Sequence, residues 1–293
     1  MDIRNIKEVP PVVEDGKYLE MIYELQKKLM AGYIGKIEKN LPNYPISINS
    51  EKGQLVLKDF SARVIEETCE GYESTTEALK LAQAYGWNIQ ALPDDKFDML
   101  LNHLQNSNEE QADAFAFFVE LMLYANIQPE DIYSYVLDKY LDNRKFSSIT
   151  QVNLGTLFGV GHYFHEKDGY LLDQMNLWPL LTEDHLKAFD KDVEHVLSYI
   201  PGFRTSNEEL HRNEDHMLWK VAYHLNIGRN FLKNKTWKQT QELTDTVRYQ
   251  EQVVLAFINY CGYLAAMGFK PETFYVLFYK KHAVNIFRQH SHY

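Results

Sequence analysis

Cysteine is almost absent from this sequence. The two cysteines, Cys69 and Cys261, are too few for a disulfide framework or a thiolate zinc site, so the cysteine content is typical of a cytosolic protein. Basic residues are also scarce, because 30 lysines and arginines stand against 41 aspartates and glutamates, a formal net charge of −11. This excess of negative charge argues against a broad surface for binding the phosphate backbone of nucleic acid.

Long apolar runs are missing as well. The N-terminal segment MDIRNIKEVPPVVEDG has no apolar stretch of the kind found in secretory signals. The longest uncharged run, residues 253–269, is short for a membrane span and contains Asn259 and Gly262. We therefore interpret this run as a buried core helix and expect a cytoplasmic protein that does not bind membranes.

Glycine and proline are few, at 14 and 9 residues of 293, and long segments repeat apolar residues at the helical period of 3.6. Residues 17–30 and 110–123 are examples. These features predict an all-α protein, a helical bundle that forms a single domain over residues 1–293. One segment departs from the pattern, because apolar residues alternate over residues 46–57 on both sides of Glu-Lys-Gly, which predicts a small β-hairpin.

The sequence contains an internal repeat. Residues 109–143 align without a gap with residues 251–285, and each copy reads as a long helix, a turn and a second helix that begins with Pro-Glu. We therefore expect a duplicated helical hairpin. The first copy belongs to an acidic half, residues 17–143, and the second to a half with a basic C-terminal end, residues 214–293. Residues 144–213 between them are interpreted as a connecting segment or insertion.

Two pairs of acidic residues have the spacing that places both side chains on one face of a helix. Glu67 and Glu70 form the first pair, and Glu110 and Asp113 form the second. Apolar residues flank each pair, so burying these like charges would be costly unless a cation neutralised them. Four carboxylates suit Mg²⁺ or Mn²⁺ better than zinc. The alternative is that each pair lies on a solvated helix face.

The last segment of the chain carries basic and polar residues on one helical face. Lys281, Asn285 and Arg288 have the spacing i, i+4 and i+7, and Gln289 and Tyr293 follow them. Lysine supplies a point charge and arginine a planar fork, which together can neutralise and orient a polyphosphate. The alternative is that these charges only stabilise the C-terminal end of a helix.

Four short motifs occur in order along the chain: LQKKLM at residues 25–30, ETCE at 67–70, EQAD at 110–113 and FYKKHAVNIFRQHSHY at 278–293. The last one resembles the signature Lys-Asn-x-x-Asn-x-x-Arg-Gln-x-x-Gly-Tyr, and the first resembles Leu-Gln-x-x-Leu-Asn. The two acidic motifs resemble the metal motifs Glu-x-x-Glu and Glu-x-x-Asp. Together they resemble the all-α dimeric dUTPases, a branch of the all-α nucleoside triphosphate pyrophosphohydrolases that also includes phage dCTPase/dUTPase enzymes and MazG proteins. Residues 144–213 have no counterpart in that family.

The resemblance implies an Mg²⁺-dependent dUTPase, a hydrolase that converts dUTP and water to dUMP and diphosphate. It also implies a homodimer in a bacterial or phage-infected cytoplasm, with a deoxynucleoside triphosphate as substrate and neither nucleic acid nor membrane as a partner. Glu67 is our candidate for the base that takes the proton of the attacking water. The implied ligands are Glu67, Glu70, Glu110 and Asp113 for the metal, Lys281, Asn285, Arg288 and Tyr293 for the phosphates, and Gln26, Phe117 and Gln289 for the base and sugar.

The sequence departs from the family pattern at four positions. Met30 and His282 stand where relatives have asparagine, Ala116 where close relatives often have histidine, and His292 where the signature has glycine. These changes leave the metal and phosphate residues intact but affect recognition of the base. Hydrolysis of dCTP, dTTP or a modified pyrimidine nucleotide is therefore an alternative, and a helical protein that binds nucleotides without hydrolysing them is another.

Overall fold

The protein is all-α in a computed structural model, which confirms the fold class expected from the sequence. The structure describes Ile3 and residues 6–13, 17–85, 92–132, 134–135, 208–233, 243–267, 269 and 271–291, and no strand occurs among them. Most of the expected connecting segment, residues 144–207, lies outside this description. The helices are α1 (Tyr18–Tyr33), α2 (Glu51–Ala84), α3 (Asp94–Tyr124), α9 (Glu208–Phe231), α10 (Thr246–Ala266) and α11 (Pro271–Ser291).

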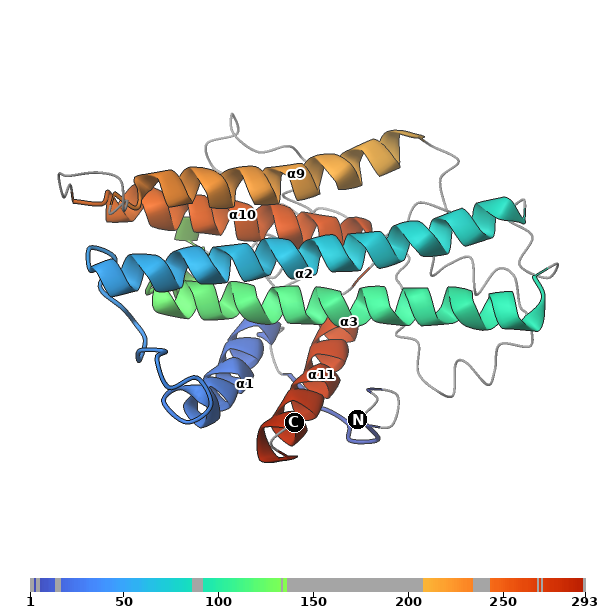
Figure 1. Ribbon diagram of the computed structural model, residues 1–293, viewed down its shortest axis with the longest axis horizontal. Coiled ribbons are helices and arrows are strands. Elements are labelled where there is room, and N and C mark those ends of the chain that lie inside the picture. Colours follow the sequence, from blue (N-terminus) through green and yellow to red (C-terminus); the bar gives the residue numbers. More distant parts are fainter. Residues whose placement is uncertain are drawn as a thin grey trace, which may run out of the picture.

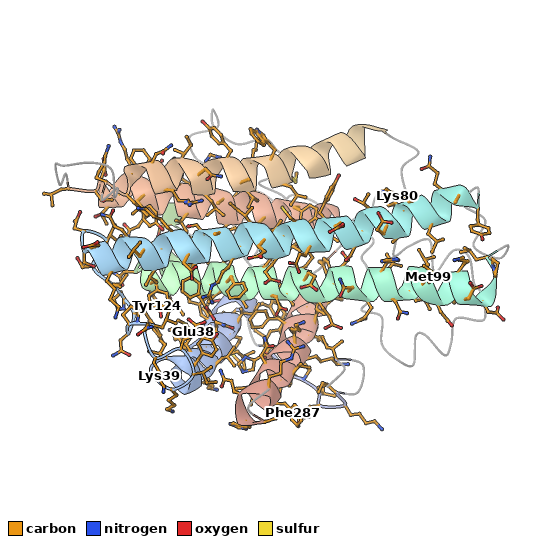
Figure 2. The ribbon with its side chains drawn as sticks, viewed as in Figure 1. Glu38, Lys39, Lys80, Met99, Tyr124 and Phe287 are labelled. Atoms are coloured by element: carbon orange, nitrogen blue, oxygen red, sulfur yellow. The ribbon has the colours of Figure 1, made fainter. Side chains whose placement is uncertain are left out.

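The long helices form a bundle on which two shorter helices pack. The antiparallel hairpin of α2 and α3 lies beside the pair of α9 and α10, whereas α1 and α11 cross α3 at a steep angle and contact each other (Figure 1). Lys80 and Met99 mark the end of the α2–α3 hairpin that is remote from α1 (Figure 2). Within the described ranges, no helix is long and apolar enough to cross a membrane, and the predicted core helix is the buried α10.

The β-hairpin predicted for residues 46–57 is wrong, because most of this segment begins α2. The hydroxyl of Ser50 caps the helix by accepting a hydrogen bond from the N–H of Gly53 at 3.0 Å. Leu57 and Phe60 are both fully buried, as the helical period requires for one face of α2. The local alternation of apolar residues therefore coincided with the start of a 34-residue helix.

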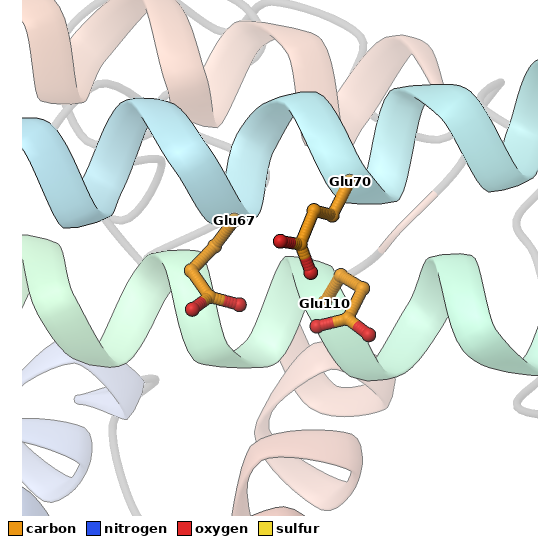
Figure 3. Close-up of side chains that lie close together, drawn as sticks. All are labelled: Glu67, Glu70 and Glu110. Atoms are coloured by element: carbon orange, nitrogen blue, oxygen red, sulfur yellow. The ribbon is translucent and has the colours of Figure 1, made fainter.

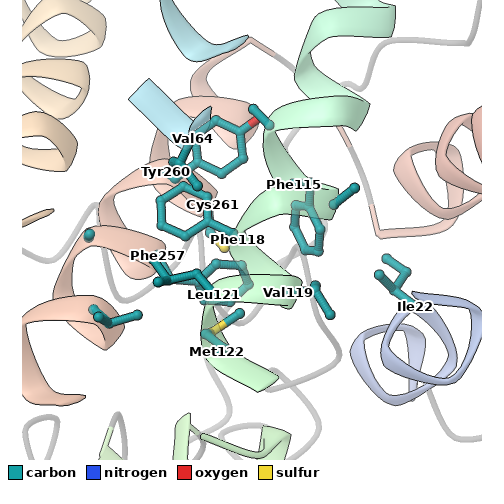
Figure 4. Close-up of a cluster of buried hydrophobic side chains, with 14 of the residues drawn as sticks. Ile22, Val64, Phe115, Phe118, Val119, Leu121, Met122, Phe257, Tyr260 and Cys261 are labelled. Atoms are coloured by element: carbon teal, nitrogen blue, oxygen red, sulfur yellow. The ribbon is translucent and has the colours of Figure 1, made fainter. Parts of the chain in front are cut away.

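An aromatic cluster forms the core where α3, α10 and α11 meet (Figure 4). The ring centroid of Phe115 lies 5.3 Å from that of Phe257 on α10 and 4.9 Å from that of Phe274 on α11. These side chains are fully buried. Because such a packed cluster fixes the position of α11 against α3, it also fixes the polar face of α11 with respect to the acidic face of α3.

The two copies of the repeat contact each other through corresponding residues. Phe115 corresponds to Phe257 and Phe118 to Tyr260, and the second pair stacks with ring centroids 5.1 Å apart. The cross contacts are reciprocal, since Phe115 lies 6.3 Å from Tyr260 and Phe118 lies 5.6 Å from Phe257. This is the contact pattern of two similar helices related by an approximate two-fold axis, as expected of a duplicated hairpin.

The backbone also repeats where the first helix of each copy ends. In both copies two N–H groups just past the helix bond back to its last turn, which satisfies carbonyl groups that the helix leaves unpaired. These bonds join corresponding positions of the two copies, which is what a duplicated hairpin predicts. The hydrogen bonds are Ala125 N to Leu121 O (2.9 Å) and Ile127 N to Met122 O (2.8 Å) in the first copy, and Met267 N to Tyr263 O (2.9 Å) and Phe269 N to Leu264 O (3.0 Å) in the second.

Candidate active site

Three carboxylates from two helices meet on the side of α3 that faces α2. Glu67 and Glu70 extend from α2 toward Glu110 on α3 (Figure 3), and one oxygen of each lies within 4.8 Å of the others. The i, i+3 spacing places the two α2 residues on one helical face, as the sequence predicted. In the part of the chain that the structure describes, this is the one group of at least three side chains placed to hold a metal ion.

A glycine allows the two helices to approach closely beside this acidic cluster. A Cβ atom at Gly71 would overlap the side-chain amide of Gln111 and would lie 3.4 Å from the Cβ of Glu110. The amide of Gln111 has little freedom to move away, because the Tyr260 hydroxyl donates to its Oε1 at 2.8 Å. The absence of a side chain at Gly71 thus sets the spacing at which the carboxylates face one another.

The carboxylates of the cluster disfavour one another's ionisation. Burial, followed by the charge of Asp113 and a hydrogen bond that Glu67 donates to Glu110, raises the pKa of Glu67 from 4.5 to about 8. Burial also raises the pKa of Glu110, although the charge of Lys281 opposes this shift. Crowded, partly buried oxygen donors of this kind fit a hard divalent cation such as Mg²⁺, which would replace the shared proton.

Asp113 lies next to this cluster and is held by α11. The amine of Lys281 contacts Asp113 Oδ2 at 3.0 Å and Glu109 Oε2 at 3.1 Å, and the side chain of Lys281 is only 7% exposed. Asn285 also hydrogen-bonds to Asp113. Burial raises the pKa of Asp113 above its ordinary value, and the ion pair with Lys281 opposes this shift. Lys281 of the same chain therefore neutralises Asp113, the fourth predicted metal ligand.

A cavity of about 640 Å³ opens between α1, α2, α3 and α11. It brings together side chains from the early and the final parts of the sequence. Among the predicted site residues, Glu70, Glu110 and Lys281 lie outside its lining, and Tyr293 lies outside the described residues. The predicted site residues that line the cavity are Gln26, Glu67, Asp113, Phe117, Asn285, Arg288 and Gln289.

The end of the cavity near α1 is built differently from the acidic end. The guanidinium of Arg63 lies over the rings of Phe60 and Phe117, 4.9 and 5.6 Å from their centroids. The side-chain amide of Gln26 donates to Glu120 Oε1 at 2.5 Å, and both residues are buried. This end therefore offers an aromatic ring, a cation and a buried hydrogen-bonded pair.

Sequence reasoning missed Arg63, Glu109 and Glu120. For Glu120 a signal was available, because it is a single acid in an apolar stretch and follows Phe117 by three residues and Asp113 by seven, which places it on the same face of α3. For Arg63 and Glu109 the sequence gives no comparable signal, since their roles depend on how separate helices pack.

The second copy of the repeat lacks the acidic cluster. Gln252 and Leu255 stand at the positions of Glu110 and Asp113. The amide oxygen of Gln252 lies 2.8 Å from Nδ1 of His224 on α9, within hydrogen-bonding distance. The hairpin of α9 and α10 therefore carries a neutral polar contact where α2 and α3 gather carboxylates.

The raised pKa of Glu67 predicts how pH and Mg²⁺ affect the stability of the metal-free protein. Glu67 loses its proton near pH 4.5 in the unfolded chain but keeps it up to about pH 8 in the folded protein. The free energy of unfolding should therefore fall as pH rises from 4.5 to about 8. At pH 8, Mg²⁺ at about 100 times its Kd should raise Tm by roughly 5 °C, and the increase should be smaller at pH 5, where protons compete.

Differential scanning calorimetry with EDTA or MgCl₂ at the two pH values measures both effects. NaCl at matched ionic strength is the control, because it screens the carboxylates without binding them specifically. An equal Tm with NaCl and MgCl₂ at pH 8 would contradict a metal site in this cluster.

No family model, curated protein or solved structure matches this chain. The assignment to the all-α dUTPases therefore stays a prediction from the four sequence motifs. The functional argument depends on what the side chains around the cavity can do chemically.

Proposed function

We propose that this protein is an Mg²⁺-dependent deoxynucleoside triphosphate pyrophosphohydrolase, which converts a deoxynucleoside triphosphate and water to the monophosphate and diphosphate. One observation carries the proposal. Glu67 of α2 and Asp113 of α3 line a single cavity together with Asn285 and Arg288 of α11, although these residues are far apart in the sequence, and Glu67 also belongs to the cluster with Glu70 and Glu110. The resemblance to dUTPases makes dUTP the reference substrate.

The residues that would hold Mg²⁺ are the three clustered glutamates together with Asp113. When bound, Mg²⁺ would neutralise phosphate oxygens and lower the pKa of a coordinated water. The donor set supports this choice, because it consists only of carboxylate oxygens and contains no histidine or cysteine.

Glu67 is the residue to which we assign the proton transfer. It lines the cavity, whereas Glu70 and Glu110 do not, so its carboxylate is the one of the three that a phosphate bound in the cavity would meet. In the reaction the oxygen of water bonds to phosphorus, the bond between the α and β phosphates breaks, and the proton of the water passes to Glu67. The burial that raises the pKa of Glu67 also makes its ionised form a stronger base.

The phosphate chain would lie against α11. Arg288 is exposed and offers a planar set of donors, and Asn285 lies one helical turn before it on the same face. Lys281 is committed to Asp113 and Glu109 in the free protein. We therefore assign Lys281 first to positioning Asp113, and its contact with phosphate remains a prediction from the sequence signature. Positioned positive charge of this kind is the main source of catalysis in phosphoryl transfer.

The other end of the cavity would receive the nucleoside. Phe117 lines it and its ring is held by Phe60 and Arg63, so it can pack against deoxyribose and disfavour a 2′-hydroxyl. Gln26 and Gln289 line the same cavity, and the amide of Gln289 donates to the Leu29 carbonyl at 3.2 Å. The resemblance further supports a cytoplasmic homodimer. Sedimentation of the full chain measures the oligomeric state.

A panel of deoxynucleoside triphosphates tests the proposal. The full chain is incubated with Mg²⁺ and dUTP, dCTP, dTTP, dATP or dGTP, and products are separated by ion-exchange chromatography. We expect a monophosphate and diphosphate in equal amounts, and no reaction in EDTA. Release of orthophosphate and a diphosphate nucleotide would contradict the proposal, and tight binding without product over hours would favour a nucleotide-binding protein.

A further inference from the structure

Two of the predicted phosphate-binding residues of α11 are bonded to one carboxylate of α3. Lys281 and Asn285 lie one turn apart on α11. The amine of Lys281 lies 3.0 Å from Asp113 Oδ2, and Asn285 donates a hydrogen bond to the same carboxylate. The side chain of Asp113 is only 19% exposed, so solvent screens these contacts weakly. In the metal-free protein, Asp113 therefore occupies donors that the proposed function assigns to the substrate.

A carboxylate and a phosphate bind to the same kind of partner. Both are anions whose oxygens accept hydrogen bonds, and the N–H groups of lysine and asparagine donate to either of them. A phosphate that approached Lys281 while Asp113 stayed in place would bring two negative charges together in a partly enclosed cavity, which is unfavourable. Asp113 and a phosphate therefore compete for Lys281 and Asn285.

Asp113 also lies beside the carboxylate cluster, where a divalent cation would attract it. The charge of Asp113 helps to raise the pKa of Glu67, which belongs to that cluster. Asp113 thus has two possible partners, the amine of Lys281 and a metal ion held by the cluster. A divalent ion carries twice the charge of an ammonium group and attracts a carboxylate more strongly at the same distance.

Lys281 has a second carboxylate that would keep its charge balanced if Asp113 moved away. Its amine lies 3.1 Å from Glu109 Oε2. An ammonium group has three N–H donors, so Lys281 can stay bonded to Glu109 and offer another donor to a phosphate. The release of Asp113 therefore does not leave a buried cation without a partner.

We propose that Asp113 blocks the phosphate-binding face of α11 in the metal-free protein, and that its transfer to the metal cluster makes Lys281 and Asn285 available to phosphate. Metal binding would then strengthen phosphate binding through Asp113, and the coupling would be reciprocal. The inference rests on the proposed function for its two sites, but it concerns how these sites are coupled.

The first test measures binding of inorganic diphosphate in EDTA by titration calorimetry. Asp113→Asn keeps the shape of the side chain but removes the charge that holds Lys281. We expect the Kd for diphosphate to fall roughly tenfold relative to the unaltered full chain. Glu110→Gln is the matched control, because Glu110 belongs to the same acidic group but hydrogen-bonds to Glu67. It should change the Kd by less than about twofold.

The second test measures binding of Mn²⁺, a spectroscopic substitute for Mg²⁺, in the absence of nucleotide. The electron paramagnetic resonance signal of the free ion gives the Kd. In Lys281→Met the Kd for Mn²⁺ should fall roughly tenfold, because Asp113 no longer has a competing cation. Lys280→Met removes a neighbouring, more exposed charge and should change the Kd by less than about twofold. If Lys281 instead had to hold Asp113 in place for the metal, the Kd would rise.

The outcomes separate this inference from the proposed function. If Asp113→Asn binds diphosphate more tightly but the unaltered protein hydrolyses no triphosphate, the hydrolase proposal fails and the inference stands. If triphosphate is hydrolysed but Asp113→Asn binds diphosphate no more tightly, the inference is overturned and the hydrolase proposal stands. Equal tightening in Glu110→Gln, or an unchanged or higher Kd for Mn²⁺ in Lys281→Met, also overturns it. If one of the two variants fails to fold, the other test decides.

Discussion

Replacing Glu67 with glutamine should lower kcat for triphosphate hydrolysis by about 10³-fold and at the same time stabilise the metal-free protein. The rate falls because the amide cannot accept the proton of water, a contribution of about 10²–10⁴-fold for a positioned base. The stability rises because Glu67 is held among Glu110, Asp113 and Glu70, whose charges all raise its pKa. Removing its charge should increase the free energy of unfolding at pH 8 by about 1–2 kcal/mol, after allowance for solvent screening of a half-buried group.

The combination of the two effects is the informative result. Glu66 is the matched control, since it is an exposed acid on the neighbouring face of α2 and Glu66→Gln should change neither kcat nor stability by much. Steady-state kinetics and urea unfolding in EDTA measure the two quantities. An undiminished rate in Glu67→Gln would remove the assignment of Glu67 as the base, whereas loss of rate together with loss of stability would indicate a structural role instead.

The sequence predicted the parts of the site that depend on helical periodicity. Glu67 with Glu70, and Asn285 with Arg288, each share a helix face because residues three or four apart always do, whatever the tertiary structure. The apolar residues beside the acidic pairs predicted that these faces turn toward the bundle. The structure brings Glu67, Glu70 and Glu110 together and places Glu67, Asn285 and Arg288 at one cavity, but Glu70 is exposed to solvent. The metal and the substrate remain predictions.

The remaining features depend on distances between helices, which no spacing along the chain encodes. The approach of α2 to α3 depends on how Gly71 packs against Gln111, and the charge on Lys281 is balanced by Glu109 only because the aromatic core fixes α11 against α3. The error over residues 46–57 had a different cause. A short alternation of apolar residues fits a strand and the start of an amphipathic helix equally well, and the cap at Ser50 decides between them.

The second large effect is expected at Lys281, the buried cation of the site. The variant Lys281→Met retains most of the side-chain volume but leaves Asp113 and Glu109 without their partner. Removing one member of a buried ion pair costs about 3–5 kcal/mol, because the remaining charge is not compensated. We therefore expect a lower Tm in the metal-free protein. Lys280→Met, one residue earlier and more exposed, is the control and should have little effect.

A double mutant distinguishes the two roles that Lys281 could have. If Lys281 mainly holds Asp113 and Glu109, the metal-free protein loses stability in Lys281→Met, and Glu109→Gln in the same chain restores part of the loss because it removes one of the uncompensated charges. If Lys281 mainly binds phosphate, KM for the triphosphate rises, metal-free stability changes little and Glu109→Gln restores nothing. The geometry favours the first outcome, since the amine lies 3.0 and 3.1 Å from two carboxylates and its side chain is only 7% exposed. Unfolding curves of the two single variants and the double variant in EDTA measure the coupling, and kinetics with Mg²⁺ measure KM.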